Sequence, residues 1–460
     1  MKSNRILAVT LSVFMLHFAV LAQENVLTLK GCLEMASYND AYLRNAWLGI
    51  DAAKEQKAEA LAEYFPKVSL NAVAFGALDP LIRIGVKDVI GNSDMANNLN
   101  YEIEQIARKY GINPVYEAMQ YGYSASVSVI QPIYAGGRIV NGNRLAAAGV
   151  DASVFQRNLQ ARKTVTGVEQ AYWQTVSLTE KLLALREAEA LLDTLSRDVS
   201  AACRAGLATE TDVLQVQVKR NELAVGEKRL INGIRLSKMN LLNMIGYDYN
   251  PYSTVKNSPY PYIDDIVLSG VAEMPGKPGL YWRDENEITA NRDEAKLLDV
   301  SVRAKKLQRK MTLGEVLPQV GIGGSYSYSK MLTSGRNNGF LFATVQIPVT
   351  DWGKYSHRLK REGIAVVQAE NERDYLYGQL ILQARQLWSE MVSCWDQLEV
   401  AEEGVALAEA TLNNVRVHYK AGLVTISEVL QAQTAYRQAV DTCTDQAIAY
   451  RNAVSAYRNL

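Results

Sequence analysis

Two long stretches of the chain repeat their apolar residues with a helical period and contain no proline. They are residues 133–250 and 349–460. A proline inside a helix costs about 3 kcal/mol, so these tracts permit very long helices. Shorter segments with the same period precede them, at residues 26–63 and 290–314. The pattern therefore predicts a mainly α-helical protein.

Four short segments alternate instead between apolar and small polar residues, which predicts β-strands. Along residues 121–129, tyrosine, alanine and valine occupy the odd positions, while glycine and serine occupy the even ones. Residues 77–120 are long for a simple loop, and we expect a short helix near 101–110. The predicted strands are about 67–76, 121–133, 319–328 and 339–347.

A short turn between two helices occurs twice in nearly the same form. Its first copy contains Gly206 and Leu207, and its second contains Gly422 and Leu423. Glycine adopts the left-handed conformation that ends a helix, and a hydrophobic residue commonly follows it. The chain is therefore predicted to build the same helical hairpin tip twice, at about residues 204–209 and 420–425.

One offset of 216 positions relates the strand end, the helix start and the tip of the two halves of the chain. Gly137 lies 69 positions before Gly206, and Gly353 lies 69 positions before Gly422. At about 1.5 Å per residue, each of these helices spans roughly 100 Å. This regularity predicts a duplicated helix-strand-strand-long-helix-tip-helix unit. The division comprises a leader at 1–22, a first repeat at 23–246, an irregular connector at 247–288 and a second repeat at 289–460.

The first 22 residues have the pattern of a secretory signal peptide. Lys2 and Arg5 precede an apolar stretch that ends with Val20-Leu21-Ala22. A membrane anchor is the alternative, although the apolar stretch is short for one. No later run approaches 18 apolar residues, so any membrane contact is expected from strands or an amphipathic surface.

Composition argues against several other classes of protein. The formal net charge is zero and no basic block stands out, which gives no sign of a nucleic-acid partner. The 25 tyrosines favour interfaces or membrane–water boundaries. The cysteines stand singly and are expected to be buried thiols rather than a disulfide framework or a metal site. They are Cys32, Cys203, Cys394 and Cys443.

Four strands with one apolar and one polar face raise a problem of edges. They are too few to close a barrel, for which about eight is the usual minimum, and an open sheet leaves two edges free to pair. A barrel shared between chains closes the edges, turns the apolar face to lipid and lines a lumen with the polar face. Ordinary half-buried strands under helices are the alternative. A plain fibrous coiled coil does not explain the strands.

In the order and spacing of these elements the chain resembles the TolC-like outer-membrane efflux family. The resemblance spans nearly the whole chain after the leader and is carried by the strand pairs, the junction at 131–138 and the duplicated Ala-Gly-Leu tips. It implies a homotrimer whose chains contribute four strands each to a 12-stranded barrel in the outer membrane of a bacterial cell. It also implies a helical tunnel in the periplasm, a periplasmic adaptor and an inner-membrane pump as partners.

The resemblance places the adaptor-docking contacts at the two tips, on Gly206, Leu207, Gly422 and Leu423. The alternative is that these residues only cap helices, and both roles are compatible. An exposed leucine at a hairpin tip would offer a small apolar contact to another tip.

The resemblance also places a gate at the tunnel mouth, with Asp212, Tyr419 and Glu428 as candidates. Tyr419 matches a family tyrosine that bonds to the acid represented by Asp212. Asp212 and Glu428 also stand three positions after a threonine, which is the spacing of a capping box, and this simpler role remains open. Val424 and Gln431 depart from the family pattern, so a double acidic ring is not expected.

No arrangement of residues predicts catalysis, a cofactor or a metal. The glycine pair at 136–137 lacks the lysine and the following βαβ pattern of a phosphate loop. We therefore expect a passive exit duct for efflux or protein secretion, which takes its energy from its partners. A soluble periplasmic coiled-coil adaptor or scaffold is the alternative, and an enzyme lacks support.

Overall fold

The computed structural model describes residues 26–255, 258–270, 274–331 and 334–460. The predicted leader lies outside these residues. The chain forms two compact units, and each draws on both halves of the sequence, so the predicted division into consecutive repeats remains a prediction. The first unit contains the residues up to 52 together with 151–300 and 371–460, and the second contains 53–150 and 301–370.

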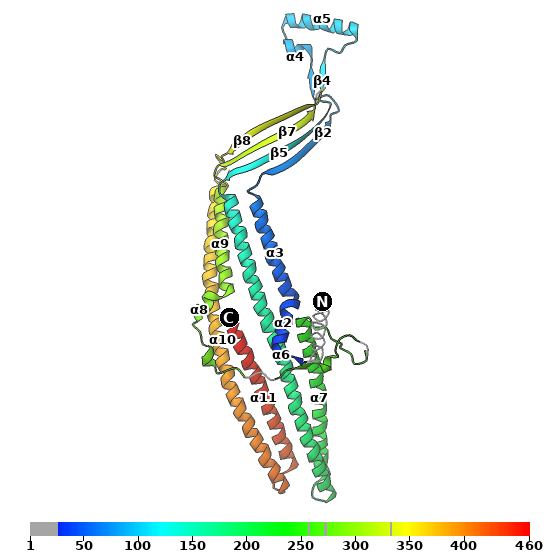
Figure 1. Cartoon of the computed structure of the whole chain (residues 1–460), viewed down its shortest axis with the longest axis vertical. Helices are drawn as coiled ribbons and strands as arrows, with labels where there is room; N and C mark the ends of the chain where they lie inside the picture. Colours follow the sequence, from blue (N-terminus) through cyan, green and yellow to red (C-terminus); the bar gives the residue numbers. More distant parts are fainter. Residues whose placement is uncertain (1–25, 256–257, 271–273, 332–333) are drawn as a thin grey trace, which may run out of the picture. The chain divides into compact units, whose positions relative to one another are not determined.

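The second unit is built on one antiparallel sheet. Its strands follow the order β2-β5-β7-β8, and they lie side by side in Figure 1. Strand β5 of the first half pairs with β7 of the second half, so one sheet joins the two repeats. Strands β2 and β8 form its two edges. The strands are β2 (Lys67–Gly76), β5 (Tyr121–Ala135), β7 (Gln319–Lys330) and β8 (Arg336–Gln346).

Strand β5 continues through Pro132 and ends at Ala135, two residues beyond the predicted end at 133. Proline lacks the N–H that a ladder needs, and the register with β7 shifts between Pro132 and Tyr134. Beyond this bulge two glycines meet. A Cβ on Gly136 would lie 2.0 Å from the carbonyl oxygen of Gly314, and Gly136 has a φ of 61°. Only glycine fits this junction between strand and helix.

The segment between β2 and β5 carries more structure than the single short helix that was predicted. Gly76 pairs with Tyr121, so the segment leaves and re-enters the sheet at one end. We call residues 77–120 the extension; its helices and hairpin are visible in Figure 1. Its elements are β3 (Ile82–Ile84), α4 (Val86–Ile90), α5 (Asp94–Tyr110) and β4 (Tyr116–Ala118), with β3 and β4 forming a hairpin.

The first unit consists mainly of two helical hairpins. Helices α6 (Arg138–Arg204) and α7 (Glu210–Ile245) form one, and α10 (Lys354–Lys420) and α11 (Ile426–Arg458) form the other. Of the two long helices, the first unit contains α6 from residue 151 and α10 from residue 371. Helices α6 and α10 are 67 residues long each, as the equal spacing of the repeats predicts. Among the described residues, no helix combines the length and the apolarity needed to cross a membrane.

Each of the two shorter helices predicted at 26–63 and 290–314 is divided at a single residue. Asp40 separates α2 (Leu29–Asn39) from α3 (Ala41–Ala62), and Arg292 separates α8 (Glu285–Asn291) from α9 (Asp293–Gly314). Both residues have extended ψ angles, 118° and 142°. The Asp40 carboxylate accepts a bond of 2.8 Å from the backbone N–H of Tyr42, so the side chain caps the next helix. The apolar period continues across both breaks and therefore conceals them.

The connector packs against the helices through short elements. Strand β1 (Val26–Leu27) pairs in parallel with β6 (Val267–Leu268), and two 3₁₀ turns cover Ile263–Asp265 and Pro278–Tyr281. The fully buried Tyr172 of α6 donates a hydrogen bond of 2.7 Å to the Ser269 carbonyl. This polar contact in the core of the first unit ties the connector to the long helix.

All four cysteines are free thiols. Cys32 is buried in the core around Tyr172, and burial raises the pKa of its thiol to about 11. The other three cysteines are partly exposed. No group of three or more histidine, cysteine or acidic side chains in the described part of the chain is arranged to hold a metal ion.

Candidate functional site

Both tips end their incoming helix in the same way. Gly206 and Gly422 have φ angles of 75° and 70°, in the left-handed region. A Cβ at either glycine would meet nothing within 4 Å, so glycine is required by the backbone conformation and not by lack of space. The Leu207 N–H donates to the Ala202 carbonyl at 2.8 Å, and the Leu423 N–H donates to the His418 carbonyl at 2.9 Å. These bonds close the helix ends as a Schellman motif does.

The tip leucines are not needed for this capping. Their backbone N–H groups make the bonds, while the side chains of Leu207 and Leu423 are 83% and 73% exposed. Such exposure is unfavourable in an isolated chain, because burying a leucine side chain would stabilise the protein by about 1.5–3 kcal/mol. The tips therefore present two apolar contacts at the ends of the hairpins.

The two acidic gate candidates differ in their contacts. The Asp212 carboxylate accepts from the Thr209 N–H at 2.9 Å, and the Thr209 hydroxyl accepts from the Asp212 N–H at 3.2 Å, so the capping box is complete. In the second tip only half of this exchange is present: the Glu428 N–H donates to the Thr425 hydroxyl at 3.4 Å. Within the described residues, the exposed Glu428 carboxylate has no hydrogen bond or ion pair.

A groove of about 720 Å³ lies between the two tips within the first unit. Leu207 and Asp212 line it from the first tip, and Tyr419 lines it from the second. Burial, followed by the nearby charges of Asp212 and Asp198, raises the pKa of the Tyr419 hydroxyl. The hydroxyl therefore stays protonated and can donate a hydrogen bond. Among the described residues, however, no hydrogen bond joins Tyr419 to Asp212.

The sequence patterns did not predict two charged residues of this groove. Asp198 of α6 and Arg416 of α10 both line it. More than 200 positions separate them, and they are brought to one groove by the packing of the hairpins. Buried side chains of α6, α7 and α11 form that packing, including Leu192, Val216 and Val429. No local pattern around either charge indicates its position in the groove.

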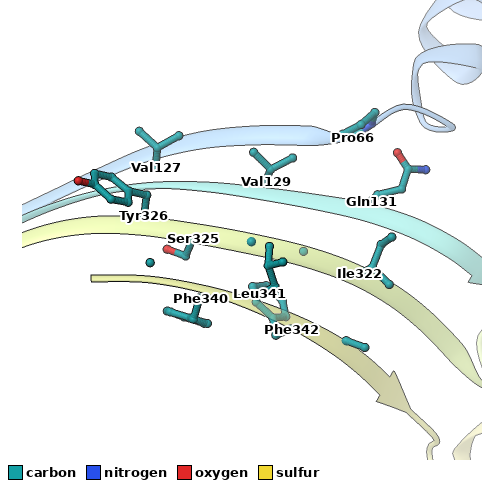
Figure 2. A pocket seen from close by; sticks show the side chains of 14 residues that line it. Pro66, Val127, Val129, Gln131, Ile322, Ser325, Tyr326, Phe340, Leu341 and Phe342 are labelled. Carbon is teal, nitrogen blue, oxygen red and sulfur yellow. The ribbon is translucent and has the colours of Figure 1, made fainter. Parts of the chain in front are cut away.

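The register of the sheet confirms the predicted separation of its faces. Val129 pairs with Val68 and Gly324, and Gly324 pairs with Leu341, so these positions share one face. Ser128 stands between Ser69 and Ser325 on the other face. Figure 2 shows Val127, Val129 and Leu341 projecting from the apolar face. Gly324 leaves room there for an apolar groove of about 970 Å³, beside Ile322.

The polar face is less uniform than predicted. Phe75, Phe340 and Phe342 project from it among the serines. A Cβ on Gly122 would lie 2.6 Å from the Phe75 ring, and one on Gly323 would lie 2.6 Å from the Phe342 ring. Two of the phenylalanines thus cover glycines of the neighbouring strand, which compensates for the side chains that those glycines lack.

Comparisons with known proteins agree with this architecture. Residues 288–459 match the model of the family described as outer membrane efflux protein. The structure is similar to the outer membrane protein VceC of Vibrio cholerae, with a TM-score of 0.69, 15% identity, and coverage of 94% of this chain and 95% of VceC. This chain has the fold of a TolC-like outer-membrane channel. A comparison with curated proteins found no match.

Two further channels support the same fold. The Campylobacter jejuni outer membrane channel CmeC has a TM-score of 0.72 at 13% identity, with coverage of 95% of this chain and 85% of CmeC. The open-state outer membrane channel MtrE of Neisseria gonorrhoeae has a TM-score of 0.67 at 14% identity, with coverage of 94% and 88%. The resemblance to the TolC-like family and the predicted fold class are confirmed.

The family match supports an outer-membrane efflux channel and an outer-membrane location for this TolC-like protein. It identifies a transport conduit and not an enzyme. It also disfavours the soluble adaptor or scaffold as the alternative. The tip residues and the gate candidates remain predictions, because their contacts with other chains are not part of the structure.

Proposed function

We propose that the chain is the outer-membrane exit duct of a tripartite efflux or secretion system in a bacterial cell. Three copies form a 12-stranded barrel, and the helices extend it as a tunnel into the periplasm. The observation that carries this proposal is the sheet β2-β5-β7-β8, which has an apolar face, a serine-rich face and two unpaired edges. Pairing β8 of one copy with β2 of the next satisfies both edges.

The tips serve in this proposal as the contact with a periplasmic adaptor. Leu207 and Leu423 are exposed at the two turns, and the groove between the tips contains both acidic and basic side chains. An adaptor with an apolar helical tip fits these leucines. The adaptor links the duct to an inner-membrane pump, which supplies the energy.

The mouth of the tunnel is proposed to close near the same groove. Glu428 is the foremost gate residue, because its carboxylate is exposed and not engaged in its own helix cap. Asp212 and Tyr419 line the groove beside it and position the wall of the mouth. Three copies of Glu428 around an axis would form a ring that attracts cations.

The first test measures the detergent dependence and the oligomeric state of the mature chain. We expect extraction only with detergent, and a mass of three copies by light scattering after correction for the detergent. A chain that is released by osmotic shock as a soluble monomer would exclude the duct.

The docking role is tested by replacing both tip leucines in the double variant Leu207→Ser/Leu423→Ser. Burying one leucine contributes about 1.5–3 kcal/mol, so loss of both is expected to weaken adaptor binding by at least about tenfold. Cross-linking in cells, followed by mass spectrometry of the captured periplasmic protein, measures the loss. Leu183→Ser is the matched control, because Leu183 is an exposed leucine far from the turn of α6. Equal cross-linking in the double variant and the control would contradict docking at the tips.

A further inference from the structure

The extension, residues 77–120, is too poorly packed to be explained as a structure that stands alone. Its only buried side chains are those of Ala96, Asn100, Ala107 and Ala118. Segments of about 40 residues seldom fold without disulfides, metals or association. The extension contains no cysteine, and its hairpin has three residues per strand. An isolated two-stranded hairpin is marginally stable in water.

Helix α5 has an apolar stripe that is only half covered. Ala96, Asn100 and Ala107 lie on the covered half and are buried. Met95, Leu99, Ile106 and Tyr110 lie on the adjoining half, because positions four, seven and eleven apart return to nearly the same side of a helix. All four are exposed, with Met95 at 81% and Ile106 at 58%. We call these four residues the α5 stripe.

The geometry of the α5 stripe suits a second helix. Met95 and Ile106 are eleven positions apart, as are Leu99 and Tyr110. Eleven residues complete just over three turns, so the stripe runs nearly parallel to the helix axis and can face a neighbour along its whole length. Tyrosine and methionine are also enriched where protein surfaces meet.

The charges of α5 favour another protein helix over a lipid surface. The helix carries three acidic and two basic residues, whereas helices that lie on membranes are rich in lysine and arginine on their polar face. Glu104 is already paired with Arg108 at 3.8 Å. Glu102 and Lys109 lie beside the α5 stripe, one of each sign. A pair of identical helices can therefore place unlike charges opposite each other.

We propose that the α5 stripes of neighbouring copies pack against one another and form a helical cluster at the end of the sheet that carries the extension. This inference rests on the proposed duct. The extension directly follows Gly76, the last residue of the edge strand β2, which in the duct pairs with the next copy. Every duct thus holds three α5 stripes close together, and this raises their effective concentration.

The test introduces the photo-cross-linking amino acid benzoylphenylalanine at Ile106 in the full chain, in cells. Asn97 is the matched control, because it is exposed on the opposite side of α5. We expect irradiation to yield covalent adducts of two chains at Ile106, several-fold above the yield at Asn97. Leu99 serves as a second position on the α5 stripe, in case one substitution impairs folding.

The outcomes separate this inference from the proposed duct. Adducts between chains at both stripe positions support the cluster. Adducts with lipid or with a different protein, or no adducts at all while the detergent-extracted chain still has the mass of three copies, would overturn the cluster and leave the duct standing. A monomeric unsubstituted chain would exclude the duct itself, and with it the cluster.

Discussion

Asp212 and Glu428 occupy equivalent positions in the two tips but are held differently. The Asp212 carboxylate is committed to its capping box, with bonds to the backbone and the hydroxyl of Thr209. The Glu428 carboxylate has no such bonds among the described residues. Glutamate is one methylene longer than aspartate, and its side chain does not complete the capping box with Thr425. Identical spacing along the chain therefore leaves one acid structural and the other available for another role.

This difference predicts opposite results for two alanine variants. Asp212→Ala should destabilise the start of α7 by about 0.5–2 kcal/mol, as loss of a helix cap does. Glu428→Ala should change stability by less than about 0.5 kcal/mol, as exposed substitutions usually do.

If Glu428 lines the closed mouth, the same variant should raise single-channel conductance in planar bilayers or change the block by cations. Glu428→Gln isolates the charge. Unchanged conductance and block in both Glu428 variants would leave Glu428 without a gating role.

At the scale of elements, the strand-to-helix junctions show how the duplication is preserved in the backbone. Gly136 and Trp352 are related by the repeat offset, and their φ angles are 61° and 56°. The following glycines, Gly137 and Gly353, have φ angles of 77° and 85°. Tryptophan tolerates the left-handed region poorly, so the second junction is strained where the first is not. The Asp351 carboxylate supports this turn by accepting from the Gly353 N–H at 3.1 Å.

The first junction should not tolerate a side chain. In Gly136→Ala the new Cβ would lie 2.0 Å from the Gly314 carbonyl oxygen, in a backbone conformation that already disfavours alanine. We expect a loss of unfolding free energy of more than about 2 kcal/mol, read as a lower denaturant midpoint of the purified channel. Gly378→Ala is the control: a Cβ there meets nothing within 4 Å, and alanine in a helix gains about 0.5–1 kcal/mol over glycine. Equal midpoints for the two variants would refute the steric account.

At the scale of the whole molecule, two features of the sheet favour the proposed duct. Its apolar face exposes side chains such as Leu70 and Leu341, at 73% and 90%. Its edges β2 and β8 are unpaired within the described part of the chain. Lipid would cover the exposed apolar face, and a closed ring of strands would pair both edges. The same reasoning explains why a single soluble copy is not expected.

The two faces of β2 should therefore respond differently to the same charge. Leu70 lies on the apolar face and Asn71 on the serine-bearing face, at adjacent positions of the strand. Leu70→Lys should cost about 2–4 kcal/mol if it meets the middle of a bilayer, whereas Asn71→Lys should be tolerated in a polar lumen. The yield of assembled channel in the outer-membrane fraction measures both. Similar yields for the two variants would contradict a lipid-facing apolar side.

The sequence by itself determined the periodicities, the duplication and the tips. Helix and strand patterns, glycine turns and threonine caps act over a few residues, so they can be recognised without the rest of the chain. The extent of the strands was predicted to within about three residues, but the divisions at Asp40 and Arg292 were concealed by a continuous apolar period. Only the tertiary structure decided that β5 pairs with β7, that Asp198 and Arg416 share a groove, and that half of the stripe on α5 lacks a partner. These features depend on contacts between residues far apart in the chain, and local preference carries no information about such contacts.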